Sequence, residues 1–124
     1  MTHPSPTLLH DFFECSFRLD GSALEASIEL NAAHPIFEGH FPGQPIVPGV
    51  CMIHMLKEVL ELALDRSLEL QSASNIKFVA FIDPRLHPAI QLSCSWQQQA
   101  DQLRVSAVLK GKETIFFKFK GDFH

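Results

Sequence analysis

The fold is decided by residues 34–50, which read HPIFEGHFPGQPIVPGV. Within this stretch, His40 stands among glycines and prolines, just ahead of an apolar segment that begins at Val50. Each proline fixes its own backbone φ angle and disfavours helix in the residue before it, whereas glycines permit conformations that a side chain would block. The pattern therefore predicts a stiff, shaped loop, which is a poor place for a merely structural histidine.

Immediately after this loop the hydrophobic pattern becomes helical. From Val50 to about Asp65, apolar residues recur at roughly helical spacing, and the first two turns are apolar nearly all round, as in a buried helix. The first backbone N–H groups, those of Gly49, Val50 and Cys51, lack acceptors inside the helix and can receive an anion or a polarised carbonyl oxygen. The sequence thus predicts a base and an oxyanion site close together in the chain.

Strand patterns lie on both sides of the loop and helix. Before the loop, residues 8–19 and 24–30 alternate and are separated by the turn residues Asp20-Gly21-Ser22. After the helix, four more strands are expected, over residues 74–82, 89–96, 103–109 and 114–119. This order favours an α+β fold in which an antiparallel β-sheet is wrapped around one central α-helix.

Length and charge limit the organisation and the partners. A chain of 124 residues fits one domain, which we expect to cover residues 1–124 with residues 1–7 as a flexible lead. The net charge is -4 with neutral histidines, and lysines and arginines form no run. A nucleic-acid partner is therefore not expected.

Cysteine usage and hydropathy limit the environment. The three cysteines are odd in number and lack metal-ligand spacing, so reduced thiols are expected rather than disulfides or a metal site. No signal-peptide pattern is found at the start, and no apolar run approaches the ~20 residues that span a membrane. We therefore expect a cytoplasmic protein without a membrane partner.

The segment from Gly39 to Val50 resembles the hot-dog-fold dehydratases of fatty-acid synthesis, which remove water from 3-hydroxyacyl groups carried on acyl carrier protein. The order of the expected strands and helix also matches that family, and Lys77-Phe78 begins a family-like strand. The resemblance implies a hot-dog fold, a substrate carried on acyl carrier protein or CoA, and no cofactor. It also implies a homodimer or higher homo-oligomer, with the active site at a seam between two subunits.

The resemblance assigns roles to residues of the loop and the helix start. The family histidine that matches His40 removes the α-proton, and the amide of the glycine that matches Gly49 helps hold the thioester oxygen. Val50 completes the oxyanion region, and we count Phe41 and Pro48 among the substrate-binding residues. A neutral imidazole is basic enough near pH 7 for this task, and fixed donors stabilise the developing enolate.

On the central helix, the chain departs from the family pattern. The family usually places Glu or Asp there to help expel the β-hydroxyl, and the matching residue is His54. Glu58 follows four residues later, on the same helix face, and could favour the protonated imidazole, making His54 an acid. The alternatives are that His54 is an ordinary core histidine and Glu58 a solvated or interface charge.

Three functions remain open at this point. The first is a dehydratase that converts a 3-hydroxyacyl thioester to a 2-enoyl thioester. The second is an acyl thioesterase on the same fold. The third is a non-catalytic acyl-binding or assembly subunit that needs a partner.

Two further sets of residues have open roles. Phenylalanines that could line a tunnel or a dimer interface are Phe78, Phe81, Phe116, Phe117 and Phe119. Basic residues that could assemble a surface for an acidic carrier are Lys57, Arg66, Lys77 and Arg85.

Overall fold

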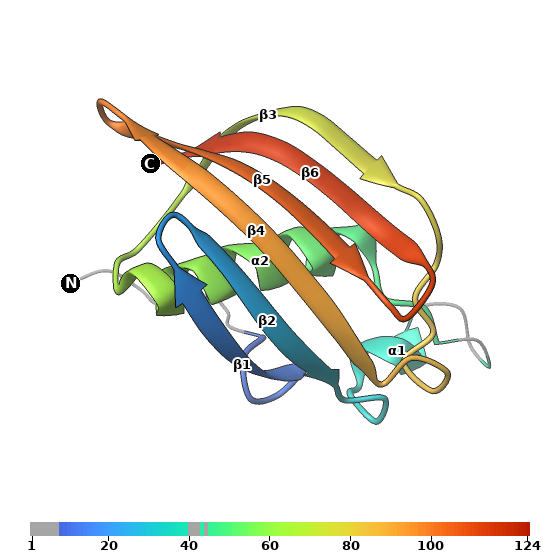
Figure 1. The fold of residues 1–124 in the computed structure, drawn as a ribbon. Helices are drawn as coiled ribbons and strands as arrows, with labels where there is room; N and C mark the ends of the chain where they lie inside the picture. Colours follow the sequence, from blue (N-terminus) through green and yellow to red (C-terminus); the bar gives the residue numbers. More distant parts are fainter. Residues whose placement is uncertain (1–7, 40–42, 44) are drawn as a thin grey trace.

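A six-stranded antiparallel sheet curves around one long helix (Figure 1). The structure is a computed structural model that describes residues 8–39, 43 and 45–124. The elements follow one another as β1 (Phe13–Asp20), β2 (Ala23–Leu30), α1 (Ile36–Gly39), α2 (Gly49–Leu64), β3 (Leu70–Phe78), β4 (Ala89–Gln99), β5 (Gln102–Lys110) and β6 (Ile115–Phe123). The predicted α+β arrangement is confirmed.

The strand order in the sheet is β1-β2-β4-β5-β6-β3, so β1 and β3 form its two edges. The predicted hairpin of β1 and β2 is present, with Gly21 at a φ of 61° in its turn, a conformation that glycine adopts without strain. The strand begins at Phe13 and not at residue 8, because residues 8–12 fold into a turn whose amides bond to the Leu8 carbonyl.

The core lies between α2 and the inner face of the sheet. In β2, alternate residues are buried, and in β6 the buried Phe117 and Phe119 alternate with the exposed Lys118 and Lys120. The helix contributes Cys51, Met52, Met55, Leu56, Val59 and Leu60. Its predicted extent is correct to one residue at each end, and it stops where Asp65 takes the left-handed conformation at a φ of 51°.

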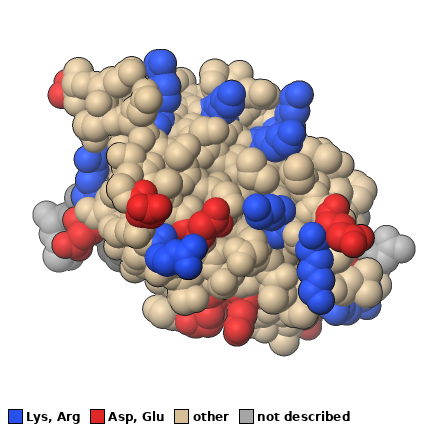
Figure 2. Space-filling view, in the orientation of Figure 1, with Lys and Arg blue, Asp and Glu red and all other residues tan. Residues whose placement is uncertain are grey.

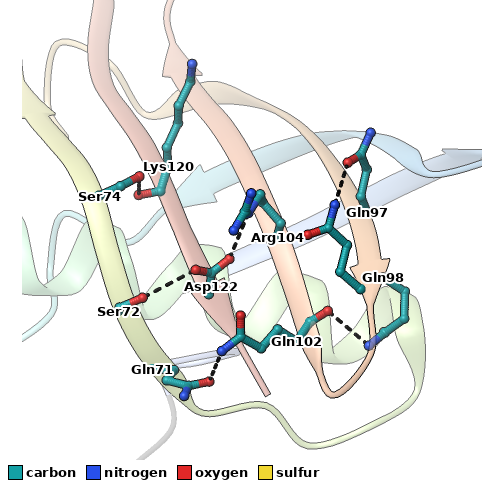
Figure 3. A network of polar contacts seen from close by, with 10 residues as sticks. Gln71, Ser72, Ser74, Gln97, Gln98, Gln102, Arg104, Lys120 and Asp122 are labelled. Carbon is teal, nitrogen blue, oxygen red and sulfur yellow. Dashed lines mark hydrogen bonds and ion pairs between the residues drawn. The ribbon is translucent and has the colours of Figure 1, made fainter.

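The strands after α2 differ in extent from the prediction. Strand β3 covers Leu70–Phe78 and not residues 74–82, because it lies at the edge, where all nine of its residues are exposed and no alternation marks its start. The last three strands are longer than predicted, because polar residues continue the backbone pairing beyond the apolar ones. In Figure 3, side chains of this polar end are joined by contacts such as Gln102–Gln71 and Arg104–Asp122.

A second helix, α1, was not predicted. It is four residues long, begins just after Pro35, and is started by His34, whose ring Nδ1 accepts the Ile36 N–H at 3.0 Å. His34 also contacts the ring of Phe12 edge-on. These contacts agree with a structural role for His34. Within the described part of the chain, no helix is long and apolar enough to cross a lipid bilayer.

Candidate active site

The start of α2 presents backbone donors, as predicted. Pro48 is the N-cap in an extended conformation and supplies no side-chain hydrogen bond to the helix. Its carbonyl accepts the amide of Cys51 at 3.0 Å, so Cys51 is not one of the available donors. For the amides of Gly49 and Val50, the described residues supply no acceptor, and the Val50 side chain is 71% exposed. These two N–H groups can therefore receive an oxygen from outside the protein.

A close approach explains why residue 49 is a glycine. A Cβ added to Gly49 would lie 2.7 Å from Cζ of Phe78, closer than real Cβ contacts. The Phe78 ring is itself stacked on Phe117, with ring centroids 5.3 Å apart. The end of β3 thus packs directly against the first turn of α2. Because glycine has no Cβ, the Phe78 ring can pack here. This packing does not depend on substrate binding by the Gly49 amide.

Exposed apolar side chains surround this helix start. Phe78 is 53% exposed and Phe81 79%, and Val50, Val79 and Leu86 are also well exposed. The Val47 amide donates to the Ile82 carbonyl at 2.9 Å, which holds the loop before α2 beside the segment after β3. Large exposed apolar surfaces mark binding or interaction sites, and the exposed side chains here are candidates for such a surface. Of the phenylalanines discussed above, Phe116, Phe117 and Phe119 belong to the core, and Phe78 and Phe81 to this surface.

His54 and Glu58 lie one turn apart on α2, as predicted. His54 Nε2 and Glu58 Oε1 are 3.9 Å apart, within ion-pair distance but too long for a hydrogen bond. Glu58 is 7% exposed, so the interpretation as a solvated charge is wrong. Its carboxylate oxygens accept the Leu8 amide at 3.0 and 3.1 Å. Glu58 therefore anchors the segment before β1 as well as standing beside His54.

The loop histidine lies outside the described residues. The structure describes neither His40 nor Phe41, and their roles stay predictions. The structure does describe the residues just before them. Helix α1 ends at Gly39, and its Phe37 stacks on Phe12 with ring centroids 5.5 Å apart. The other five predicted site residues are described. Gly49, Val50 and Pro48 lie together at the start of α2, whereas His54 and Glu58 lie in its second and third turns.

Cysteine nucleophiles find no support at this site. Burial raises the pKa of the Cys51 thiol, which disfavours the reactive thiolate. Met52 and Met55 are buried in the core. Among the residues with described positions, no group of three or more His, Cys, Asp or Glu side chains could hold a metal ion. The chemistry available here is proton transfer by imidazole and carboxylate, with stabilisation of an oxyanion by backbone amides.

Two hollows in the surface lie on the outward face of the sheet. They measure about 400 and 1160 Å³, and neither is lined by residues of α2. The anchoring of Leu8 by Glu58 was missed at the sequence level, since residues 50 positions apart in the chain give no local signal of contact.

Comparison with known proteins identifies the family of this chain. Residues 16–118 match the family model of ApeI-like proteins, described as ApeI dehydratase. The 3-hydroxyacyl-acyl-carrier-protein dehydratase FabZ of Caulobacter sp. (strain K31) is 30% identical over 88 residues, which are 70% of this chain and 50% of that protein. FabZ of Caulobacter vibrioides (strain NA1000 / CB15N) is 33% identical over 89 residues, 70% of this chain and 51% of the relative. The chain thus spans about half the length of these relatives.

Solved structures show the same fold. The dehydratase heterocomplex ApeI:P from Xenorhabdus doucetiae aligns with a TM-score of 0.70 at 19% identity, covering 93% of this chain and 98% of that chain. A sigma28-regulated virulence protein from Campylobacter jejuni aligns with a TM-score of 0.66 at 12% identity, covering 87% and 80%. At these identities the likeness concerns the fold alone. The family match, which covers most of the chain, goes further: this chain belongs to the ApeI-like dehydratase family and has the hot-dog fold.

Proposed function

We propose that this protein is a dehydratase that removes water from a 3-hydroxyacyl group carried on acyl carrier protein and releases a 2-enoyl thioester. The observation that carries the proposal is the start of α2, where the Gly49 and Val50 amides lack an acceptor among the described residues and face an open apolar surface. The relatives named above as dehydratases of acyl-carrier-protein substrates support the choice of substrate class.

The proposed mechanism divides the elimination among three groups. His40 takes the proton from the carbon next to the thioester, while the Gly49 and Val50 amides stabilise the negative charge that develops on the thioester oxygen. The electron pair of the broken C–H bond forms the C=C bond, and the β-hydroxyl leaves with a proton as water. Phe41 and Pro48 contact the substrate beside these groups.

His54 supplies that last proton in our proposal, and Glu58 stands beside it on the same helix face. The 3.9 Å separation and the burial of Glu58 support an electrostatic coupling between the two, since charges interact more strongly away from water. Glu58→Gln keeps the shape and an oxygen acceptor for Leu8 but removes the charge. We expect lower turnover and an altered pH profile of kcat; unchanged values would remove Glu58 from the mechanism.

We further propose that the active form is a homodimer in the cytoplasm, in which the second subunit covers the apolar surface at the start of α2. The exposed side chains of Phe78, Val79 and Phe81 support this, and so does the uncovered edge strand β3. In such a dimer, the loop histidine of one subunit would meet the helix residue of the other.

A second candidate is a subunit that acts only with a related partner. It is favoured by His54, which replaces the usual helix carboxylate, and by the fact that the ApeI:P structure is a heterocomplex. In this case the isolated chain would bind acyl groups or assemble without turning them over.

Intact-mass analysis of 3-hydroxyacyl carrier protein incubated with the purified protein tests these alternatives. We expect the loss of one water from the wild type and no loss from His40→Ala. His10→Asn is the matched control, because His10 is an exposed histidine at a positive φ of 76° that asparagine also tolerates. Loss of the whole acyl group would indicate a thioesterase, and an unchanged mass with substrates of several chain lengths would favour the partner-dependent subunit.

A further inference from the structure

Three lysines form a strip on the outward face of the sheet. In β6 the buried Phe117 and Phe119 point to the helix, so Lys118 and Lys120 point away from it. Lys77 of β3 is the register partner of Lys118 and lies on the same outward face. We call Lys77, Lys118 and Lys120 the lysine strip. Figure 2 shows blue side chains without red ones over the upper right of this face, where Figure 1 places β3 and β6.

The described residues do not balance the charges of the strip. Like charges directly opposite each other on neighbouring strands are destabilising, and Lys77 and Lys118 are such a pair. Among the described residues, no carboxylate lies within 4.0 Å of the ammonium groups of these three lysines. The nearby Asp122 pairs with Arg104 at 3.2 Å. In Figure 3, the Lys120 side chain extends away from that polar network.

Other basic residues proposed at the sequence level are already engaged. Lys57 lies 3.6 Å from Glu61, and Arg85 lies 3.1 Å from Asp83. Arg66 donates to the side chain of Gln98 at 3.1 Å. Of that set, only Lys77 belongs to a patch of like charge, and its partners in the patch come from β6, which sequence spacing did not connect with it.

The strip begins beside the candidate active site. Lys77 directly precedes Phe78, whose ring packs against Gly49 at the start of α2. At its other end, Lys120 borders the hollow of about 1160 Å³ on the outward face. The far half of this face differs in charge, because Glu14 of β1 and Glu29 of β2 are register partners there. Two glutamates thus face each other in the far half of the sheet, whereas two lysines face each other in the half that adjoins the start of α2.

We propose that the lysine strip is the docking surface for an acidic carrier protein that delivers the thioester to the start of α2. This inference rests on the proposed function and adds the contact that a carrier needs. A chain with a net charge of -4 repels an acidic partner as a whole, so a local basic strip is needed to steer and orient it. The partner buries the Lys77–Lys118 pair against carboxylates and removes their repulsion.

The test compares two double variants with the same number of charge reversals. Lys118→Glu/Lys120→Glu changes the strip, and Arg18→Glu/Arg66→Glu changes exposed residues on β1 and just after α2. Each is assayed with a 3-hydroxyacyl carrier protein and with the same acyl group on pantetheine, a small thioester that has no carrier to dock. Circular dichroism checks that both variants are folded.

For the strip variant we expect KM for the carrier-bound substrate to rise about tenfold or more, since steering by charge speeds association by at least that factor. Its kcat and its turnover of the small thioester should stay unchanged. The wild-type KM should rise with salt, and the variant should lose that dependence. Equal effects of the two variants, or equal effects on both substrates, would overturn the inference.

A binding measurement keeps the inference testable if the wild type turns out to have no dehydratase activity. Holo carrier protein is titrated into each protein by calorimetry, a readout that needs no turnover. Weaker binding by the strip variant alone supports docking even where the proposed reaction fails. Binding that is unaffected by the strip variant overturns docking, and a strip-dependent change in sedimentation would then assign this face to contacts between copies of the chain.

Discussion

The first turn of α2 and its middle turns differ in what they contact. At the start, Val50 is exposed and the Gly49 amide has no acceptor among the described residues, with only the Phe78 ring packed closely beside it. In the middle, Leu60 is fully buried, and the carboxylate of Glu58 is occupied by the Leu8 amide. The difference indicates that one helix separates two tasks. Its middle stabilises the fold, and its start, with the exposed Val50, is the part that we propose for substrate and partner.

The largest effect on stability is expected from the middle of the helix. Leu60→Ala removes a fully buried side chain and leaves a cavity, so we expect the free energy of unfolding to fall by about 2–5 kcal/mol. Urea denaturation followed by circular dichroism measures this. A loss below about 1 kcal/mol would mean that the site collapses easily and that the middle of α2 is less tightly packed than the structure indicates.

A smaller loss is expected when the anchor of the N-terminal turn is removed. Glu58→Leu leaves the Leu8 amide without its carboxylate, so we expect a loss of about 1–3 kcal/mol. Glu58→Gln, which retains an oxygen acceptor, should lose less. Urea denaturation of both variants provides the measurement, and equal losses would show that an uncharged oxygen acceptor at position 58 does not hold the Leu8 amide.

At the start of α2, Gly49→Ala should affect activity more than stability. The new Cβ would displace the Phe78 ring, which is half exposed and can move, at a cost of about 1 kcal/mol, typical of a single substitution. We expect kcat/KM for the dehydration to fall well beyond what this loss of stability explains, because the oxyanion donors shift. Phe78→Leu in the same chain should restore part of kcat/KM if the clash is the cause.

The smallest effect is expected at Val50, the most exposed position of the first turn. Val50→Ser removes exposed apolar surface, so we expect the free energy of unfolding of the monomer to change by less than about 0.5 kcal/mol. Its effect should appear instead in the dimer, as a shift toward monomer in sedimentation experiments. A marked loss of monomer stability would mean that Val50 belongs to the core.

The sequence allowed the architecture to be predicted wherever one face of an element is buried. The helical spacing from Val50 onward located α2 to within one residue, and the alternation in β2 identified that strand. Strand β3 was placed incorrectly because both its faces are exposed, which leaves no alternation in the sequence. The extent of an edge strand depends on the partner it pairs with, here β6, and a single sequence does not show that pairing.

The candidate site was predictable in part for the same reason. Gly49 and Val50 were singled out because proline and glycine mark a helix start locally. His54 was singled out because it matches the family's helix carboxylate, and Glu58 because it follows one helical turn later. The contact of Glu58 with Leu8 joins positions 50 apart, and the Lys77–Lys118 pair joins neighbouring strands whose residues are 41 positions apart in the chain. Such contacts depend on how the chain folds back on itself, which local periodicity does not encode.

The contact between Gly49 and Phe78 also bears on how this family can diverge. Because the ring occupies the space that a Cβ at position 49 would need, position 49 cannot gain a side chain while position 78 keeps its ring. If Phe78 is replaced first by a smaller residue, Gly49 can then be replaced without a clash. If Gly49 is replaced first, its new Cβ clashes with the Phe78 ring. Positions 49 and 78 are therefore expected to evolve as a pair, with the change at 78 coming first.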